Sequence, residues 1–267
     1  ADLNIKLNPK GGEKLHIGID SLYIHKLGFN QYDYTNLFAV GKLDNELFDG
    51  RIIAHDPNLH LLFQGIVTLH PLNGGDNVFN FYADIPFADL QKLNIDKRGI
   101  KSQISLRTMA NLSTNSNGMF GNVDIKNVTY WGAEKEYNFG AISMKSAFQD
   151  TNYIIDVNAP FLQANLHSTE PFSRFKNRIL DKTVYSHWGD VFTQKSNSSD
   201  HSQDTTINKG RTEILITTAD ITPVCEILLP NLYISDNSTI NFLYTPEDSL
   251  MLDIHSPAWG LGSTLLS

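Results

Sequence analysis

The 267-residue chain is poor in the features that mark several common classes of protein. It has a single cysteine, Cys225, which excludes a disulfide framework within the chain and any metal site built from several cysteines. No apolar run approaches the roughly 20 residues that a membrane-spanning helix needs. Lys and Arg number 21 against 29 Asp and Glu, and the formal net charge is −8. This balance argues against a nucleic-acid partner, which requires clustered positive charge.

Sequence motifs of catalysis and cofactor binding are missing as well. The chain has no HExxH motif, no GxSxG elbow, no Walker loop and no Rossmann glycine set. The nine histidines are scattered, without a compact cluster of His and carboxylates. A carboxylate pair for glycoside hydrolysis would meet in space rather than in sequence, and no pattern points to one. The sequence therefore predicts a protein that is not an enzyme and holds no cofactor or metal.

The two ends of the chain resemble interior segments. The chain begins with the strand-like Leu3-Asn4-Ile5, without an initiator Met or a signal peptide, and it ends in another strand-like segment. We therefore expect a piece of a longer protein, with any targeting or anchoring segment outside it.

The most informative stretch is Asn58 to His70. Its odd positions, from Leu59 to Leu69, are apolar or Gly, whereas most even positions are polar, Leu62 and Ile66 being the exceptions. Alternation over so many residues predicts a strand about twice the usual length of five to six residues, with one apolar face. The preceding Asp56-Pro57-Asn58 is typical of a turn. Together with the strand-like Leu47 to His55, these segments predict a long hairpin with an apolar side.

The same alternation recurs along the chain between turn signals such as Asn73-Gly74-Gly75-Asp76 and Asp150-Thr151-Asn152. Three stretches break it and favour short helices: Phe87 to Leu93, the segment after Thr169, and Thr222 to Pro230. The polar Gln194 to Lys209 predicts a mobile loop. We expect a first curved β unit over residues 1–168 and an amphipathic helix plus polar loop over 169–210. A second β unit over 211–267 then continues the same sheet and is cut off at its C-terminal end.

Two distant segments also match in pattern at an offset of 136 residues (220 minus 84). Ala83-Asp84-Ile85 corresponds to Ala219-Asp220-Ile221, and Leu93 corresponds to Leu229. Either the match is chance or the sheet is elongated and repetitive.

So many strands with one apolar face must cover that face. A second sheet could cover it, as in a β-sandwich, or the sheet could curve into a trough, and the pattern alone leaves both open. A continuous trough would shelter acyl chains, since burial stabilises by about 0.8 kcal/mol per methylene. The residues predicted to line it are those of the apolar stripes: Leu59, Leu61, Phe63, Val67, Leu69, Phe79, Phe81, Ile104, Leu106, Ile155, Val157, Ile240, Phe242, Leu250 and Leu252.

Several short runs occur in an order that resembles a known family. They are Asn45-Glu46-Leu47-Phe48-Asp49-Gly50-Arg51, Asp56-Pro57-Asn58-Leu59, Phe79-Asn80-Phe81-Tyr82-Ala83-Asp84, Ala88-Asp89-Leu90-Gln91-Lys92-Leu93-Asn94-Ile95 and Gly121-Asn122-Val123-Asp124-Ile125. In this order they resemble the TamB (translocation and assembly module) proteins of the AsmA-like superfamily, especially the Bacteroidetes branch. Each run is short, and the resemblance covers most of the chain.

The resemblance implies a mainly β, curved, mostly antiparallel sheet shaped like a taco, with an apolar interior and two or three short helices. It implies a non-enzymatic periplasmic segment of a long envelope protein, anchored in the inner membrane by a segment outside this chain. The expected function is phospholipid transport between the inner and outer membranes, outer-membrane protein assembly, or both. The expected partners are phospholipid acyl chains and, through the parent chain, an Omp85-type outer-membrane barrel.

Two other functions remain open on the residues alone. Trp131, Trp188 and Trp259, with Tyr130, could form sugar-stacking platforms in a carbohydrate-binding β-sandwich. The chain could also be a purely structural spacer of the envelope.

Overall fold

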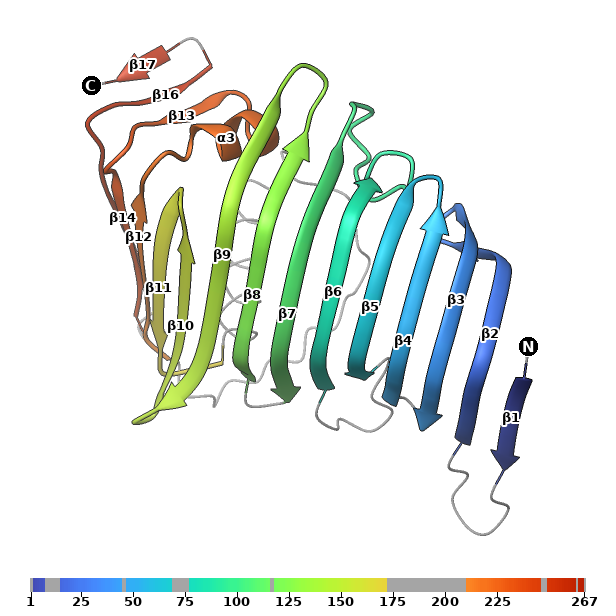
Figure 1. Ribbon diagram of the computed structural model, residues 1–267. Helices are drawn as coiled ribbons and strands as arrows, with labels where there is room; N and C mark the ends of the chain where they lie inside the picture. The colour runs from blue at the N-terminus through green and yellow to red at the C-terminus, as the bar shows by residue number, and fades with distance from the viewer. Residues whose placement is uncertain are drawn as a thin grey trace, which may run out of the picture.

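The computed structural model describes residues 2–7, 15–44, 47–68, 77–115, 118–171, 210–245, 249–262 and 264–266. Most of these residues lie in strands, and the part of the chain described contains a single helix, α3 (Thr222–Leu228) (Figure 1). The strands are β1 (Asp2–Leu7), β2 (Leu15–Phe29), β3 (Tyr32–Asp44), β4 (Leu47–Asp56), β5 (Leu59–Thr68), β6 (Asn77–Asp89), β7 (Gln103–Asn115), β8 (Gly118–Trp131), β9 (Glu136–Gln149), β10 (Asn152–Ala159), β11 (Leu162–Ser168), β12 (Thr212–Thr218), β13 (Leu232–Ile234), β14 (Thr239–Tyr244), β15 (Leu250–His255), β16 (Trp259–Leu261) and β17 (Thr264–Leu266).

Fourteen strands form one open antiparallel sheet. They follow the chain from β1 to β12, and then β14 and β15 complete the order. The strands β13, β16 and β17 form a separate three-stranded sheet. Because β12 pairs with β11, the large sheet is continuous on both sides of residues 172–209, which lie outside the described residues. The prediction of a long curved antiparallel sheet is confirmed, and the alternative of a β-sandwich is wrong.

Tight turns join many of the neighbouring strands. The β4–β5 turn is Pro57-Asn58, between the paired residues Asp56 and Leu59, as the Asp-Pro-Asn signal predicts. Asn30-Gln31 and Asp150-Thr151 have positive φ at both positions and join β2 to β3 and β9 to β10. Two positive φ values give the backbone twist that fits a two-residue hairpin. Hairpins this short keep the strands in chain order.

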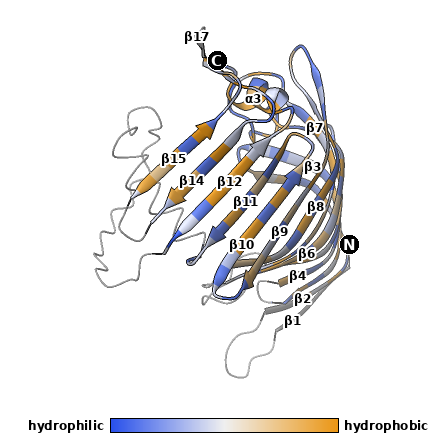
Figure 2. Cartoon of the chain, turned by 90° about the vertical axis from the view of Figure 1, so that its left-hand side faces the viewer, coloured by the Kyte–Doolittle hydropathy of each residue, from blue (hydrophilic) through white to orange (hydrophobic). Residues whose placement is uncertain are grey.

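Irregular pairing near one end of the sheet accounts for part of its curvature. The register shifts between His60 and Leu62, between Ile85 and Ala88, between Ser105 and Arg107, and between Ile125 and Val128. Each bulge bends its strand and increases the local twist. Because the bulges lie on successive strands, they align into one bend across β5 to β9. Figure 2 shows the result: β10 to β15 turn away from the wall formed by β2 to β8.

One local prediction fails. The three-residue spacing of Phe87, Leu90 and Leu93 predicts a helix, but β6 continues to Asp89 and hydrogen-bonded turns follow it. Phe87 still lies in the strand, whereas Leu90 and Leu93 lie in the turns, where the Leu93 N–H bonds to the carbonyl of Asp89. The segments matched at an offset of 136 differ locally: Asp84 lies within β6 and Asp220 follows β12, and Leu93 is 1% exposed whereas Leu229 is 56% exposed. The helix and polar loop predicted over 169–210 fall almost entirely outside the described residues.

Candidate functional site: the apolar inner face

Strand register defines the two faces of the large sheet. Successive residues of a strand point to opposite faces, and directly paired residues of antiparallel neighbours share a face. We call the face that carries Phe63 and Phe81 the inner face, and the face that carries Gln64 and Tyr82 the outer face. The pairing places every predicted lining residue on the inner face except Leu69, which lies outside the described residues.

One transverse row shows how continuous the inner face is. Each of its residues pairs directly with the next, from β2 to β15, and none has a polar side chain. The row is Ile19, Gly41, Gly50, Gly65, Phe81, Ala110, Val123, Met144, Val157, Ala164, Ile216, Ile240 and Ile254. The stripe residues of separate strands therefore join into one apolar band that crosses the strands.

Aromatic residues lie beside two of the glycines of this row, Phe48 beside Gly50 and Phe81 beside Gly65. Gly65 has a φ of +149°, and a Cβ built there would lie 2.6 Å from Phe81 Cβ. The ring centroid of Phe63 lies 5.3 Å from that of Phe81 and 6.2 Å from that of Phe48. Aromatic packing of this kind compensates for the missing side chain and permits the bent backbone. The Phe residues of β4, β5 and β6 thus form a continuous aromatic patch of the inner face.

The solvent exposure of the inner face changes from its middle to the β15 edge. Many of the least exposed residues lie on the inner face, among them Ala54 at 1%, Ala83 at 5% and Leu166 at 7%. At β15, the last strand of the large sheet, Leu252 and Ile254 lie on the same face and are 58% and 50% exposed. The inner face is therefore sheltered in its middle and accessible at this edge.

A cavity of about 310 Å³ lies at the end of the inner face near α3. Its walls include Ile104 of β7 and Ile142 of β9, together with Val224, Ile227 and Leu228 of α3. Leu90 and Phe161, from connections between strands, add to this apolar lining, and the polar Asp96, Arg98 and Ser102 also border the cavity. Figures 1 and 2 show α3 at this end, against the wall of strands. The cavity is large enough for part of an acyl chain.

Polar contacts hold the β6–β7 connection and α3 in place at this end of the sheet. Arg98, in the β6–β7 connection, binds Asp96 through Nε at 2.9 Å and Nη2 at 2.6 Å, and its Nη1 donates to the carbonyl of Ile227. The hydrogen bonds from Arg98 hold the pKa of Asp96 well below its usual range. Glu226 of α3 accepts hydrogen bonds from Lys135 Nζ at 2.8 Å and from the Tyr137 hydroxyl at 2.9 Å. These contacts tie α3 to β6–β7 and to the β8–β9 hairpin.

A buried carboxylate anchors the same end of the sheet. Asp56 is fully buried and accepts hydrogen bonds from the Tyr32 hydroxyl at 2.5 Å, from the Thr35 backbone N–H at 2.8 Å and from the Asn58 N–H at 2.8 Å. Burial alone would raise the pKa of Asp56, but these donors stabilise the charged form and lower the pKa below its ordinary value. The Asp of the turn motif therefore locks β3, β4 and β5 together, a role that the sequence signal for a turn did not include.

The described residues contain no group of three or more His, Cys, Asp or Glu that could hold a metal ion. Cys225 is buried in α3, as its apolar neighbours predict, and burial raises the pKa of its thiol. Across the described segments, none of the helices has the length and hydrophobicity required to span a membrane. The feature that this part of the chain offers is thus an extended apolar surface.

The predicted tryptophan platform does not assemble. Trp131 ends β8 and donates from Nε1 to Glu136 at 2.9 Å, whereas Trp259 lies in β16 of the small sheet. Tyr130 is buried on the inner face beside Ile104, and Trp188 lies outside the described residues.

Comparisons with family models, with curated proteins and with solved structures gave no match to this chain.

Proposed function

We propose that this chain is a length of a lipid conduit, in which the inner face binds phospholipid acyl chains while the headgroups stay in water. The observation that carries the proposal is the apolar row that crosses the sheet from Ile19 to Ile254 without a polar side chain. An acyl chain gains about 0.8 kcal/mol for each buried methylene, so a long apolar band binds it through many small contributions. No single residue is then essential.

The end near α3 supports the same proposal. The apolar cavity there continues the inner face through Ile104 and Ile142, so that an acyl chain on the trough can extend into it. At the β15 edge of the sheet, the exposed Leu252 and Ile254 give lipid access to the inner face. The inner face thus has a sheltered middle, an accessible edge at β15 and an apolar cavity beside α3.

The biological setting that we propose follows the resemblance to TamB-like proteins. The chain would be a periplasmic segment of an inner-membrane-anchored parent that moves phospholipid between membranes or assists outer-membrane protein assembly. Its partner through the parent would be an Omp85-type barrel.

Lipid analysis of the purified chain tests the conduit. Mass spectrometry of organic extracts should find phospholipid with the unaltered chain and severalfold less with the double variant Phe63→Arg/Phe81→Arg, because two guanidinium groups on the inner face oppose acyl burial. Gln163→Arg places a guanidinium group on the outer face of β11 instead and should leave the lipid content unchanged. Circular dichroism checks that each variant retains its strands. Equal lipid content in all three folded proteins, or no lipid in any, would contradict the proposal.

A further inference from the structure

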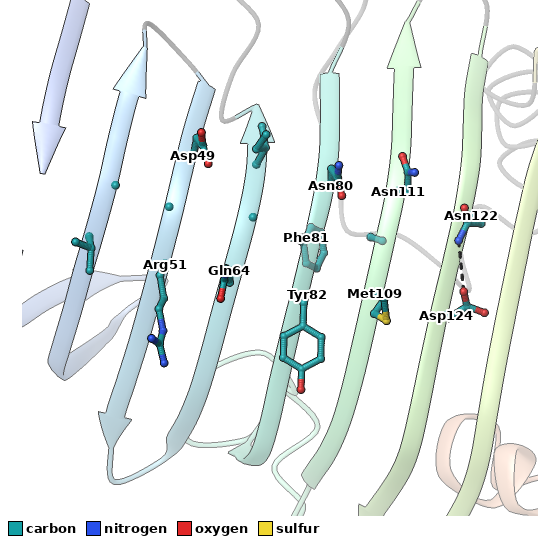
Figure 3. A pocket seen from close by; sticks show the side chains of 16 residues that line it. Asp49, Arg51, Gln64, Asn80, Phe81, Tyr82, Met109, Asn111, Asn122 and Asp124 are labelled. Carbon is teal, nitrogen blue, oxygen red and sulfur yellow. Dashed lines mark hydrogen bonds between the residues drawn. The ribbon is translucent and has the colours of Figure 1, made fainter. Parts of the chain in front are cut away.

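The outer face carries a second feature, a groove across the wall formed by β3 to β8. The groove has a volume of about 910 Å³ and lies between two transverse rows of side chains (Figure 3). One row contains Arg51, Gln64, Tyr82, Met109 and Asp124. The second row contains Asp49, Ile66, Asn80, Asn111 and Asn122.

The floor of the groove consists largely of backbone. Between the two rows lies the inner-face row, which is Gly41, Gly50 and Gly65 in β3, β4 and β5. Six strands separated by about 4.8 Å make the groove about 24 Å long. Its length suits an extended polymer rather than a compact small molecule.

The polar side chains of the groove keep most of their hydrogen-bonding capacity. Gln64, Asn80 and Asn111 are exposed, and none of their side-chain amides has a hydrogen-bond partner among the described residues. Asn122 makes a long hydrogen bond of 3.4 Å to Asp124. Amides both donate and accept, which matches hydroxyl groups. Asn80, Asn111 and Asn122 follow one another on β6, β7 and β8 along one row, and Gln64 of β5 lies in the other row. The half-buried Tyr82 adds an aromatic ring to the same surface.

The charges in the groove restrict the ligand class. Asp49 and Asp124 are acidic, and Arg51 is the only Lys or Arg among the residues that line the groove. Lys42 lies outside the lining and pairs with Asp49 at 3.5 Å. The two carboxylates, Asp49 and Asp124, are thus balanced by Arg51 and Lys42, so the groove has neither a net negative charge nor the clustered cations that a nucleic acid needs. A neutral chain rich in hydroxyl groups fits best.

We propose that this groove binds a neutral carbohydrate chain, with Tyr82 against the face of a sugar ring and the amides of Gln64, Asn80 and Asn111 bonded to its hydroxyls. The inner face takes no part in this contact, so one chain would engage lipid on one face and a glycan on the other. This second site does not depend on the conduit.

Affinity electrophoresis tests the proposal with the purified chain in native gels that contain dextran, mannan, xylan or mixed-linkage β-glucan. At least one of these neutral polysaccharides should retard the chain, and polygalacturonate should not. The variant Gln64→Ala/Asn111→Ala should weaken that binding about tenfold, since each lost hydrogen bond contributes about 0.5–1.5 kcal/mol. Tyr82→Ala should weaken it as well.

Gln163→Ala is the matched control, because Gln163 lies in the same outer row as Gln64 but on β11, away from the groove. It should bind like the unaltered chain. The proposal is overturned if none of the four neutral polysaccharides retards the chain, or if the groove variants bind as tightly as Gln163→Ala. Retardation by reduced, unfolded casein alone would assign the groove to polypeptide and overturn it too.

Discussion

The two faces of the large sheet differ most clearly in adjacent rows. The inner row that contains Phe81 has no polar side chain from Ile19 to Ile254. The neighbouring outer row, shifted by one residue on each strand, is mostly polar or charged: Val40, Arg51, Gln64, Tyr82, Met109, Asp124, Ser143, Asn158, Gln163, Thr217, Thr239 and His255. Rows that differ by one residue on each strand therefore belong to an apolar surface and to a mostly polar surface.

This contrast shows that the difference between the two faces depends on the register in which the strands pair, and that the sequence opposes slippage of this register. A slip of one residue in any strand would move its apolar side chains to the outer face. The short turns, the buried Asp56 and the glycines at close approaches of the backbone all oppose such a slip. The predictions below test the contrast between the faces, from the largest expected effect to the smallest.

The largest effect is expected at Gly121, on the inner face of β8. Its φ is +123°, and a Cβ there would lie 1.9 Å from the carbonyl oxygen of Asn111. Gly121→Val should therefore lower the free energy of unfolding by more than about 3 kcal/mol, because strain and a clash with backbone add together. Urea unfolding followed by circular dichroism measures the change.

Gly132→Ala is the control for Gly121→Val. The nearest atom to its new Cβ would be 3.5 Å away, an ordinary contact, so the change should be within about 0.5 kcal/mol. Similar losses for the two variants would show that backbone approach on the inner face is not the constraint.

Leu166 and His167 are successive residues of β11 on opposite faces. Leu166 is 7% exposed, whereas His167 is exposed. Leu166→Ala should cost about 2–4 kcal/mol in urea unfolding, since it leaves a cavity, and His167→Ala should change stability by less than about 0.5 kcal/mol. Equal costs would mean that the two faces do not differ in packing.

Asp56→Asn tests the buried carboxylate. Its donors include a hydroxyl and backbone N–H groups, so loss of the charge should cost about 2 kcal/mol at pH 7. The folded pKa of Asp56 is lowered, so its contribution is full above the unfolded pKa of about 3.9 and is lost as the pH falls through the folded pKa. The stability gap between the two proteins should therefore narrow below about pH 4. A gap that stays constant down to pH 2 would argue against this role.

The smallest effect is expected for the ion pair of Arg107 and Asp84 on the outer face. Its atoms are 3.2 Å apart, and the Arg107 side chain is 56% exposed. Arg107→Gln should lower the free energy of unfolding by about 0.5 kcal/mol or less, and 1 M NaCl should abolish the difference. A salt-independent loss above 1 kcal/mol would show that this part of the outer face contributes substantially to the stability of the fold.

Sequence alternation predicted the face of each described stripe residue, from Leu59 in β5 to Leu252 in β15, because a period of two carries over directly into an antiparallel sheet. Asp56-Pro57-Asn58 likewise predicted its turn. Alternation could not show where β6 ends, because the spacing of Phe87, Leu90 and Leu93 also fits a strand end followed by hydrogen-bonded turns.

The cavity beside α3 and the outer groove were beyond prediction for a different reason. Arg98 meets Ile227 across 129 positions of sequence, and no local pattern encodes that contact. The groove combines Gln64, Asn80 and Asn111, whose polar character merely indicated solvent exposure when each strand was read alone. Only the register places their amides along the two rows of one groove.

The most direct test of the conduit is photocrosslinking at neighbouring positions of one strand. A photoreactive amino acid is introduced singly at Leu61, Leu62 and Phe63 of β5, and at Ile214, Leu215 and Ile216 of β12, and the chain is mixed with radiolabelled phosphatidylethanolamine vesicles. Leu62 and Leu215 are apolar but lie on the outer face, so they control for hydrophobicity. We predict strong lipid adducts at Leu61, Phe63, Ile214 and Ile216 and weak adducts at Leu62 and Leu215. Equal labelling of all six positions, or none at the inner ones, would contradict the account.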